Sequence, residues 1–112
     1  MTPFFLLSQT LHIKGYNVYE STTGNGALNQ LKNHKINLIL LDLMLPDING
    51  DEVLKRIRAD KKFRDVKVII LTAMMLTPQE KKEFLSNGAS GVLTKPISIS
   101  TLASEVKAIL GK

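Results

Sequence analysis

Short aliphatic runs alternate along the chain with segments in which apolar residues recur every three or four positions. Residues 36–41 and 66–71 are almost wholly aliphatic. Runs of this kind are typical of strands buried on both faces of a parallel sheet. The pattern predicts two shorter strands, at residues 16–21 and 91–94, each close to a glycine.

The intervening segments have helical periodicity. The clearest helix start is Thr77-Pro78-Gln79-Glu80, which combines an N-cap residue, a proline in the first turn and the glutamate of a capping box. Thr2-Pro3 resembles a weaker start of the same kind. The pattern therefore predicts helices at about 2–14, 27–34, 51–60, 77–87 and 98–110, with a turn at residues 23–26 before the second helix.

Strands that alternate with helices of about ten residues indicate a parallel sheet covered by helices on both faces. A chain of 112 residues suits one compact domain with a single core. Neither an internal repeat nor a linker interrupts the pattern. We expect a single α/β domain.

Composition excludes several kinds of site. The chain has no cysteine and only two histidines, which excludes disulfides, thiolate metal sites, a cysteine nucleophile and a histidine-rich metal site. The apolar runs are too short to span a bilayer, and the apolar stretch at residues 4–7 is too brief for a signal peptide. We therefore expect a soluble cytoplasmic protein without a membrane partner.

The net charge of +5 is concentrated in one segment. Residues 55–67 carry seven cations and two anions, which accounts for the whole excess. Such a segment is compatible with contact to nucleic acid or to an acidic partner. A solvated helix end and loop explain it more simply, so the charge does not by itself assign a function.

Polar residues end three successive predicted strands: Asp42, Thr72 and Lys95. Because the carboxyl ends of parallel strands meet at one edge of an open α/β sheet, we expect these side chains to converge there. A carboxylate can attack phosphorus and form an acyl phosphate, while an ammonium and a hydroxyl contact the phosphoryl oxygens. The same residues taken singly would merely cap strands, but together they indicate phosphoryl chemistry.

These residues lie within a wider set of motifs that resembles the receiver domain of response regulators. The set is Gly15-Tyr16, Gly24 with Ala27-Leu28, Asp42 with Pro46 and Gly50, Thr72-Ala73, Gly88-Ala89 and Lys95-Pro96. The resemblance runs from about residue 3 to the C-terminus. It implies a flavodoxin-like sheet with strand order 2-1-3-4-5 and helices on both faces.

The resemblance also implies the roles of the site. Asp42 would be the phosphoacceptor, Thr72 the switch hydroxyl, and Lys95, followed by a cis bond to Pro96, the ammonium that contacts the phosphoryl group. Mg²⁺ would be bound by Asp42, the backbone carbonyl of Met44 and an acidic pair on the first strand. The partners would be a histidine kinase or phosphotransfer protein and a downstream protein, and the domain would act as a switch, not as a turnover enzyme.

The sequence departs from the family at its beginning, because the first strand with its acidic pair is missing and Met1 falls where the first helix should start. That strand is central, and burying about five residues contributes on the order of 7–15 kcal/mol. Three explanations are open: a truncated chain, a strand supplied by a second copy in a homo-oligomer, or residues 4–7 drawn into the sheet at the expense of the first helix. We favour truncation as the origin, with an oligomer or a rearranged fold as its consequence.

The same departure removes two metal ligands. With Asp42 and the Met44 carbonyl alone, we expect Mg²⁺ to bind weakly or not at all and Asp42 to accept phosphate poorly. Asp47 and Asp51 are nearby acids, but the resemblance does not assign them to the metal. The alternative is a pseudo-receiver, a protein-binding module that is not phosphorylated.

A second departure is Val92, which stands three residues before Lys95 where the family usually has an aromatic residue. A valine cannot swing between buried and exposed positions as a ring does. We therefore expect any output to depend on backbone shifts or on the loop that contains Met74 and Met75.

Overall fold

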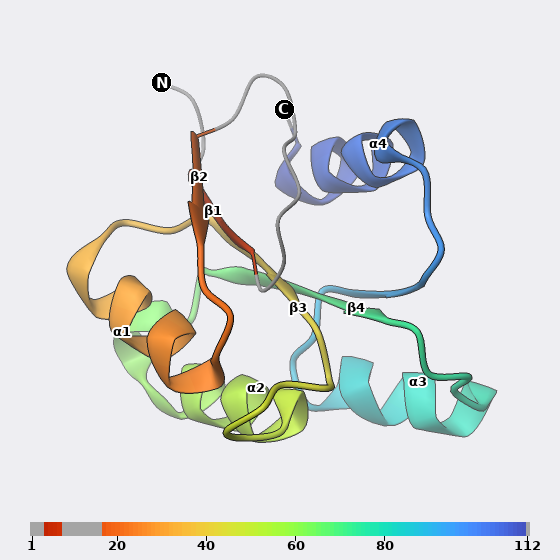
Figure 1. Cartoon of the computed structure of the whole chain (residues 1–112), viewed down its shortest axis with the longest axis horizontal. Coiled ribbons are helices and arrows are strands. Elements are labelled where there is room, and N and C mark those ends of the chain that lie inside the picture. Colours follow the sequence, from red (N-terminus) through yellow and green to blue (C-terminus); the bar gives the residue numbers. More distant parts are fainter. Residues whose placement is uncertain (1–3, 8–16, 112) are drawn as a thin grey trace.

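A single parallel sheet organises the molecule (Figure 1). The computed structural model describes residues 4–7 and 17–111. The five strands of this described part follow the order β2-β1-β3-β4-β5, and every neighbouring pair is parallel. Their bounds are β1 Phe4–Leu7, β2 Asn17–Glu20, β3 Leu38–Leu41, β4 Lys67–Thr72 and β5 Gly91–Thr94.

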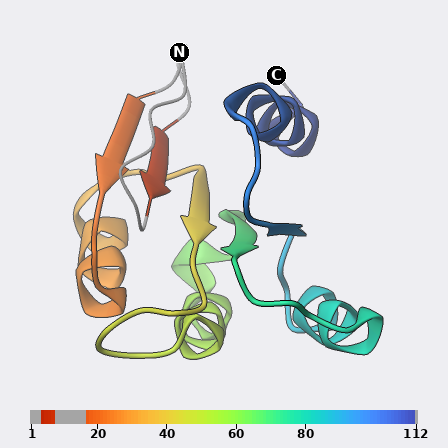
Figure 2. The ribbon, with the colours of Figure 1, turned by 45° about the vertical axis from the view of Figure 1, so that its right-hand side comes forward.

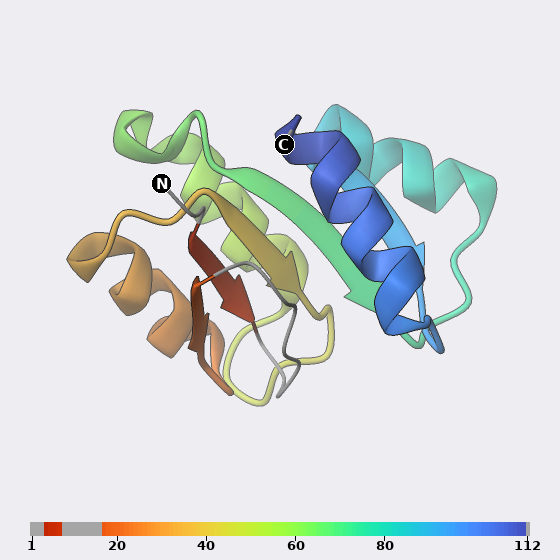
Figure 3. The same cartoon turned by 90° about the horizontal axis from the view of Figure 1, so that it is seen from above.

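Helices cover the two faces of the sheet unequally (Figures 2 and 3). The described helices are α1 Gly24–Asn33, α2 Gly50–Ala59, α3 Pro78–Ser86 and α4 Ile99–Leu110, with a short 3-10 turn at Lys61–Phe63. Helices α1, α2 and α3 lie on one side of the sheet, and α4 lies on the other (Figure 1). Within the described ranges, no helix is both long and apolar enough to cross a membrane.

Alternate residues of the central strands supply both cores. In β3, Ile39 and Leu41 belong to the core with α1 and α2, whereas Leu38 and Leu40 belong to the core with α4. All four of these side chains are buried. A strand that is buried on both faces must be aliphatic throughout, which explains the unbroken hydrophobic run in the sequence.

The architecture confirms the predicted flavodoxin-like fold. The four helices described lie within a few residues of their predicted bounds, and Thr77 and Glu80 form the predicted capping box. Ser98, at the start of the helix predicted at 98–110, is the N-cap of α4 and accepts the N–H of Thr101. Gly111 ends that helix in the left-handed conformation, with φ of 72°.

The amino-terminal expectation is corrected. Phe4–Leu7 is strand β1 and not part of a helix, and it pairs with both β2 and β3; the rest of the helix predicted at 2–14 lies outside the described residues. The central position is thus filled, as in the third explanation, and is not vacant. Two neighbouring strands offer unpaired backbone groups to this segment, and satisfying them outweighs its local helical periodicity. The expectation of a homo-oligomer by strand exchange depends on a vacant central position in the sheet, and β1 fills that position in this structure.

The start of α1 also differs from the prediction. The helix begins at Gly24, inside the segment predicted as a turn, and Thr23 is its N-cap. The Thr23 hydroxyl accepts the N–H of Gly26 at 2.9 Å. Two glycines lower the intrinsic helix propensity here, so the first turn depends on capping groups.

Candidate functional site

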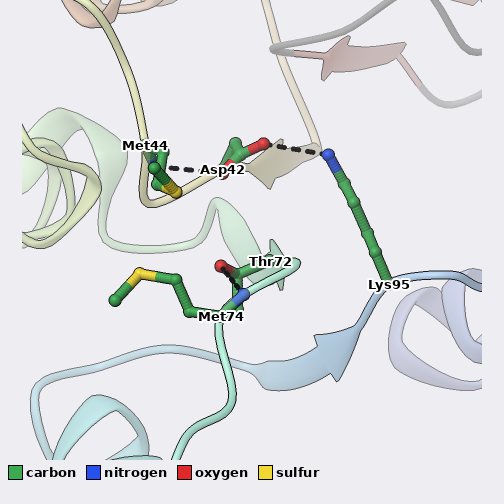
Figure 4. Close-up of polar contacts among 5 residues, drawn as sticks. All are labelled: Asp42, Met44, Thr72, Met74 and Lys95. Atoms are coloured by element: carbon green, nitrogen blue, oxygen red, sulfur yellow. Dashed lines mark hydrogen bonds and ion pairs between the residues drawn. The ribbon is translucent and has the colours of Figure 1, made fainter.

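The three predicted site residues lie at the carboxyl edge of the sheet (Figure 4). Asp42 follows β3, Thr72 is the last residue of β4, and Lys95 follows β5. The Lys95 side chain reaches across to Asp42, with Nζ 2.9 Å from Oδ2. The structure therefore joins a carboxylate and an ammonium that are far apart in the sequence, as the strand-end pattern predicts.

Asp42 is held at both of its carboxylate oxygens. Oδ2 accepts from Lys95, and Oδ1 accepts the backbone N–H of Met44 at 3.0 Å. The residue is only 8% exposed. A buried carboxylate is stabilised by such contacts, and they fix its orientation toward the open edge of the sheet.

Thr72 is fully buried and connects two neighbouring segments. Its hydroxyl oxygen accepts the N–H of Met74 at 3.1 Å. Its backbone carbonyl accepts the N–H of Lys95 at 2.7 Å. The peptide bond between Lys95 and Pro96 is cis, as the resemblance implied. The end of β4 is thus bonded both to the loop that follows it and to the residue that carries the ammonium.

The loop from Asp42 to Gly50 is closed by a tight backbone approach. The N–H of Gly50 donates to the carbonyl of Leu43 at 3.1 Å. A Cβ atom on Gly50 would lie 2.7 Å from the backbone oxygen of Asp42 and 2.8 Å from the Cα of Leu43. Both obstacles are backbone atoms, so this position requires glycine.

Asp47 binds the first turn of α1. Its two carboxylate oxygens accept the N–H groups of Gly24 and Asn25, each at 2.8 Å. These bonds, with that of Asn25 the stronger influence, lower the pKa of Asp47 to about 2. The sequence analysis did not find this role, because the contact depends on the path of the loop and not on any local motif.

The donor set does not fit a complete magnesium site. Among the residues that the structure describes, no three histidine, cysteine or acidic side chains lie together. Asp42 follows β3, Asp47 is bonded to α1, and Asp51 lies in the first turn of α2. Magnesium is usually held by one or two carboxylates with waters and substrate phosphates in an octahedral arrangement. One carboxylate already paired with a lysine is a poor basis for such a site.

An open groove runs beside the site, between the loop that follows β3 and the loop that follows β4. Its volume is about 740 Å³, and it is lined by Leu43, Met44, Leu45, Pro46, Asn49, Asp51, Met74, Leu76, Glu80 and Phe84. Met44 is 71% exposed at its rim. The groove is mainly apolar and adjoins both Asp42 and the loop bonded to Thr72.

Arg58, within the basic segment of residues 55–67, has a structural role that the sequence analysis did not predict. The Arg58 guanidinium donates to the carbonyls of Phe63, Val66 and Gly88, at 3.2, 2.7 and 2.9 Å. It therefore connects the end of α2 to the segment before β4 and to the turn after α3. This cation satisfies backbone carbonyls, so its presence in the sequence does not indicate an anionic partner.

The sheet order and the carboxylate–ammonium pair at the strand ends are the features of a receiver-type signalling module. Residues 4–107 match the family model of the response regulator receiver domain, and the chain belongs to this family. Members of this family are modules of two-component signal transduction and not classical enzymes.

Known relatives agree with this assignment. The chain is 34% identical over 105 residues to the DNA-binding dual master transcriptional regulator RpaA of Synechocystis, covering 94% of this chain and 43% of that protein. It is 30% identical to the polar-differentiation response regulator DivK of Brucella ovis, covering 95% of this chain and 85% of that protein. The chain thus spans less than half of the first relative and most of the second. The signal receiver domain of a Vibrio parahaemolyticus protein has a TM-score of 0.88 at 29% identity, over 99% of this chain and 92% of the other.

Proposed function

We propose that Asp42 accepts a phosphoryl group from a histidine kinase or phosphotransfer protein. A carboxylate oxygen of Asp42 forms a bond to phosphorus, the phosphorus–nitrogen bond of the donor phosphohistidine breaks, and the imidazole nitrogen keeps the electron pair. The observation that carries the proposal is the contact between Lys95 Nζ and Asp42 Oδ2 at 2.9 Å. It places a fixed cation beside the atom to which the phosphoryl group would be attached.

Lys95 and Thr72 have separate roles in this proposal. The Lys95 ammonium balances the carboxylate before transfer and the phosphoryl oxygens after it. The Thr72 hydroxyl turns toward the phosphoryl group and donates to it. It accepts the Met74 N–H in the present state, so its reorientation would release that bond and free the loop around Met74 and Met75.

The conformational change that follows phosphorylation would then be transmitted from the site through this loop. Val92 is partly buried against the core, and it has no ring whose position tracks the hydroxyl. Met75 is 95% exposed, and methionine side chains adapt readily to a partner surface. We propose that a downstream protein contacts this loop and the groove beside it, and that the module operates in the cytoplasm.

Phosphoryl transfer should be slow compared with a receiver that has a complete metal site. Among the described residues, no three acidic, histidine or cysteine side chains lie together to form a complete magnesium site. The Lys95 ammonium would then supply positive charge directly at the carboxylate.

The test is intact-mass measurement after incubation with a small phosphodonor such as acetyl phosphate, over a range of Mg²⁺ concentrations including none. We expect a single phosphoryl adduct at low yield, lost in Asp42→Asn and strongly reduced in Lys95→Met. Glu52→Gln is the matched control, because it also removes one negative charge near the loop and should keep the adduct. An adduct that persists in Asp42→Asn would place the phosphoryl group elsewhere and contradict the proposal.

The alternative function is a pseudo-receiver that binds a protein without being phosphorylated. The incomplete donor set favours it, whereas the retention of Asp42, Thr72 and Lys95 favours the phosphoacceptor. Complete absence of the adduct, both with the small phosphodonor and with a phosphorylated histidine phosphotransfer domain, would decide for the pseudo-receiver.

A further inference from the structure

The loop that carries Asp42 is attached to a helix that precedes it in the chain. The carboxylate of Asp47 binds the N–H groups of Gly24 and Asn25, each at 2.8 Å. These donors belong to the first turn of α1, whose N–H groups have no partner within the helix. The contact therefore satisfies two backbone donors and also fixes the middle of the loop.

Ile48 reinforces this attachment by packing. A Cβ atom on Gly24 would clash with Cγ1 of Ile48. The glycine thus lets the loop approach the helix start closely, and Ile48 also packs against the buried core on that side of the sheet. Two successive loop residues are held on α1, one by hydrogen bonds and one by van der Waals contact.

The same loop orients the phosphoacceptor. Its first part provides the Met44 N–H that binds Asp42 Oδ1 at 3.0 Å. Its last part is closed by the bond from the Gly50 N–H to the Leu43 carbonyl. Met44 lies between these fixed points, so its position depends on the path that residues 44–49 take between Asp42 and α1.

We propose that Asp47 is a positioning residue for Asp42, which holds the loop on α1 so that the Met44 N–H stays directed at the phosphoacceptor carboxylate. The functional consequence of this role rests on the proposed function, because a mobile Met44 weakens one of the hydrogen bonds that orient the Asp42 carboxylate. It also differs from the metal role considered for Asp47 in the sequence, since both of its oxygens already accept bonds from α1.

A simple helix cap would explain the contacts with α1 but not an effect on Asp42. If Asp47 only caps α1, its loss affects the first turn of that helix and the overall stability. If it positions the loop, its loss also affects Met44, which lies on a different segment. Amide hydrogen exchange at Met44 therefore distinguishes the two roles.

The experiment is amide hydrogen exchange by NMR on the full chain, comparing wild type, Asp47→Ala, Asp47→Asn and Glu52→Gln. We expect Asp47→Ala to speed exchange at Gly24, Asn25 and Met44 by about two- to tenfold, the factor that one ordinary hydrogen bond controls. Asp47→Asn keeps one acceptor oxygen and should fall between wild type and Asp47→Ala. Glu52→Gln removes a nearby charge without touching α1 and should leave all three amides unchanged.

The phosphoryl adduct provides the second readout. Under conditions where the variants remain folded, Asp47→Ala should give a smaller adduct yield than wild type, and Glu52→Gln should not. Faster exchange confined to Gly24 and Asn25, with Met44 unchanged, would overturn the proposal and leave a helix cap. If wild type gives no adduct, the proposed function fails, while exchange at Met44 still decides the role of Asp47. If Asp47→Ala does not fold, Asp47→Asn decides both readouts.

Discussion

The two loops that begin at the site are attached to the molecule in different ways. The loop from Asp42 to Gly50 has fixed contacts along its length: the close backbone approach at Gly50, and the bonds and packing of Asp47 and Ile48 on α1. The loop after β4 begins with a bond between the Met74 N–H and the Thr72 hydroxyl and ends at the Thr77 capping box. Between those ends it presents exposed methionines.

Because of this difference, the two loops have different roles at the proposed site. The first loop begins at the residue that would receive the phosphoryl group, and Asp47 and Ile48 attach it to α1. The second loop is attached at its start to the hydroxyl that would respond. A switch needs both, because a reactive group must keep its orientation while another segment changes position.

The largest expected effect comes from breaking the fixed loop with Gly50→Ala. The new Cβ would meet the backbone of Asp42 and Leu43 at under 3 Å, and backbone atoms can yield only if the loop moves. We expect a loss of about 2–4 kcal/mol in the free energy of unfolding, measured by urea denaturation. Alanine is otherwise a better helix former than glycine, so an unchanged or increased stability would contradict the close approach.

Glu52→Ala, in the same turn of α2, is the control for that measurement. Its surface ion pair with Arg56 is worth at most about 0.5 kcal/mol. A comparable loss in both variants would show that the helix start, and not the Asp42 loop, is responsible.

The second loop should be loosened by Thr77→Ala. The Thr77 hydroxyl accepts the Glu80 N–H at 3.1 Å, and loss of such an N-cap costs about 1 kcal/mol. We expect a lower urea midpoint together with faster amide exchange in the segment between Thr72 and Thr77. Ser98→Ala removes the corresponding cap of α4, and it should lower stability similarly without changing exchange at Met74. Equal effects of the two variants on Met74 would remove the distinction between the loops.

A smaller effect is expected in the dependence of stability on pH, and it arises in the first loop. The folded-state pKa of Asp47, about 2, lies below the ordinary value of 3.8. A depressed pKa contributes stability that is fully present above the unfolded value and is lost as pH falls through the folded one. Thermal melts should therefore show a gap between wild type and Asp47→Asn at pH 5 to 6 that narrows toward pH 2. A gap that is independent of pH would mean that the ionised carboxylate does not make these bonds.

The smallest effect is expected at Met75. Its side chain is 95% exposed, so Met75→Ser should change the free energy of unfolding by no more than about 0.5 kcal/mol. Phe84, partly buried against the core, provides the contrast, and Phe84→Ala should be clearly more destabilising. A marked loss in Met75→Ser would show that the second loop is packed and not adaptable.

The fold and the three strand-end residues followed from sequence because their signals are local or topological. Aliphatic runs mark buried strands wherever they occur, and parallel strands bring their ends together. The segment Phe4–Leu7 is predicted as part of a helix because Phe4 and Leu7 have helical spacing. It forms a strand because it pairs with the strands on either side. Tertiary pairing outweighs local propensity in such a short segment.

The roles of Asp47 and Arg58 were not accessible from the sequence for a related reason. Asp47 caps a helix that begins 23 residues earlier in the chain, and Arg58 binds carbonyls from two separate segments, the one before β4 and the turn after α3. Neither contact leaves a spacing pattern. Thr23 was the one local sign that α1 starts early, since it is a favoured N-cap residue directly before Gly24.

Lys95 makes one contact through its side chain and another through its backbone. The ammonium binds Asp42, whereas the backbone N–H binds the carbonyl at the end of β4. An uncharged residue other than proline at position 95 would remove the first contact and leave the second in place. In evolutionary terms, a descendant of this chain can lose in one step the charge that the proposed phosphoryl chemistry needs, while it keeps the bond between the ends of β4 and β5. Natural selection can then reuse the intact surface for another purpose.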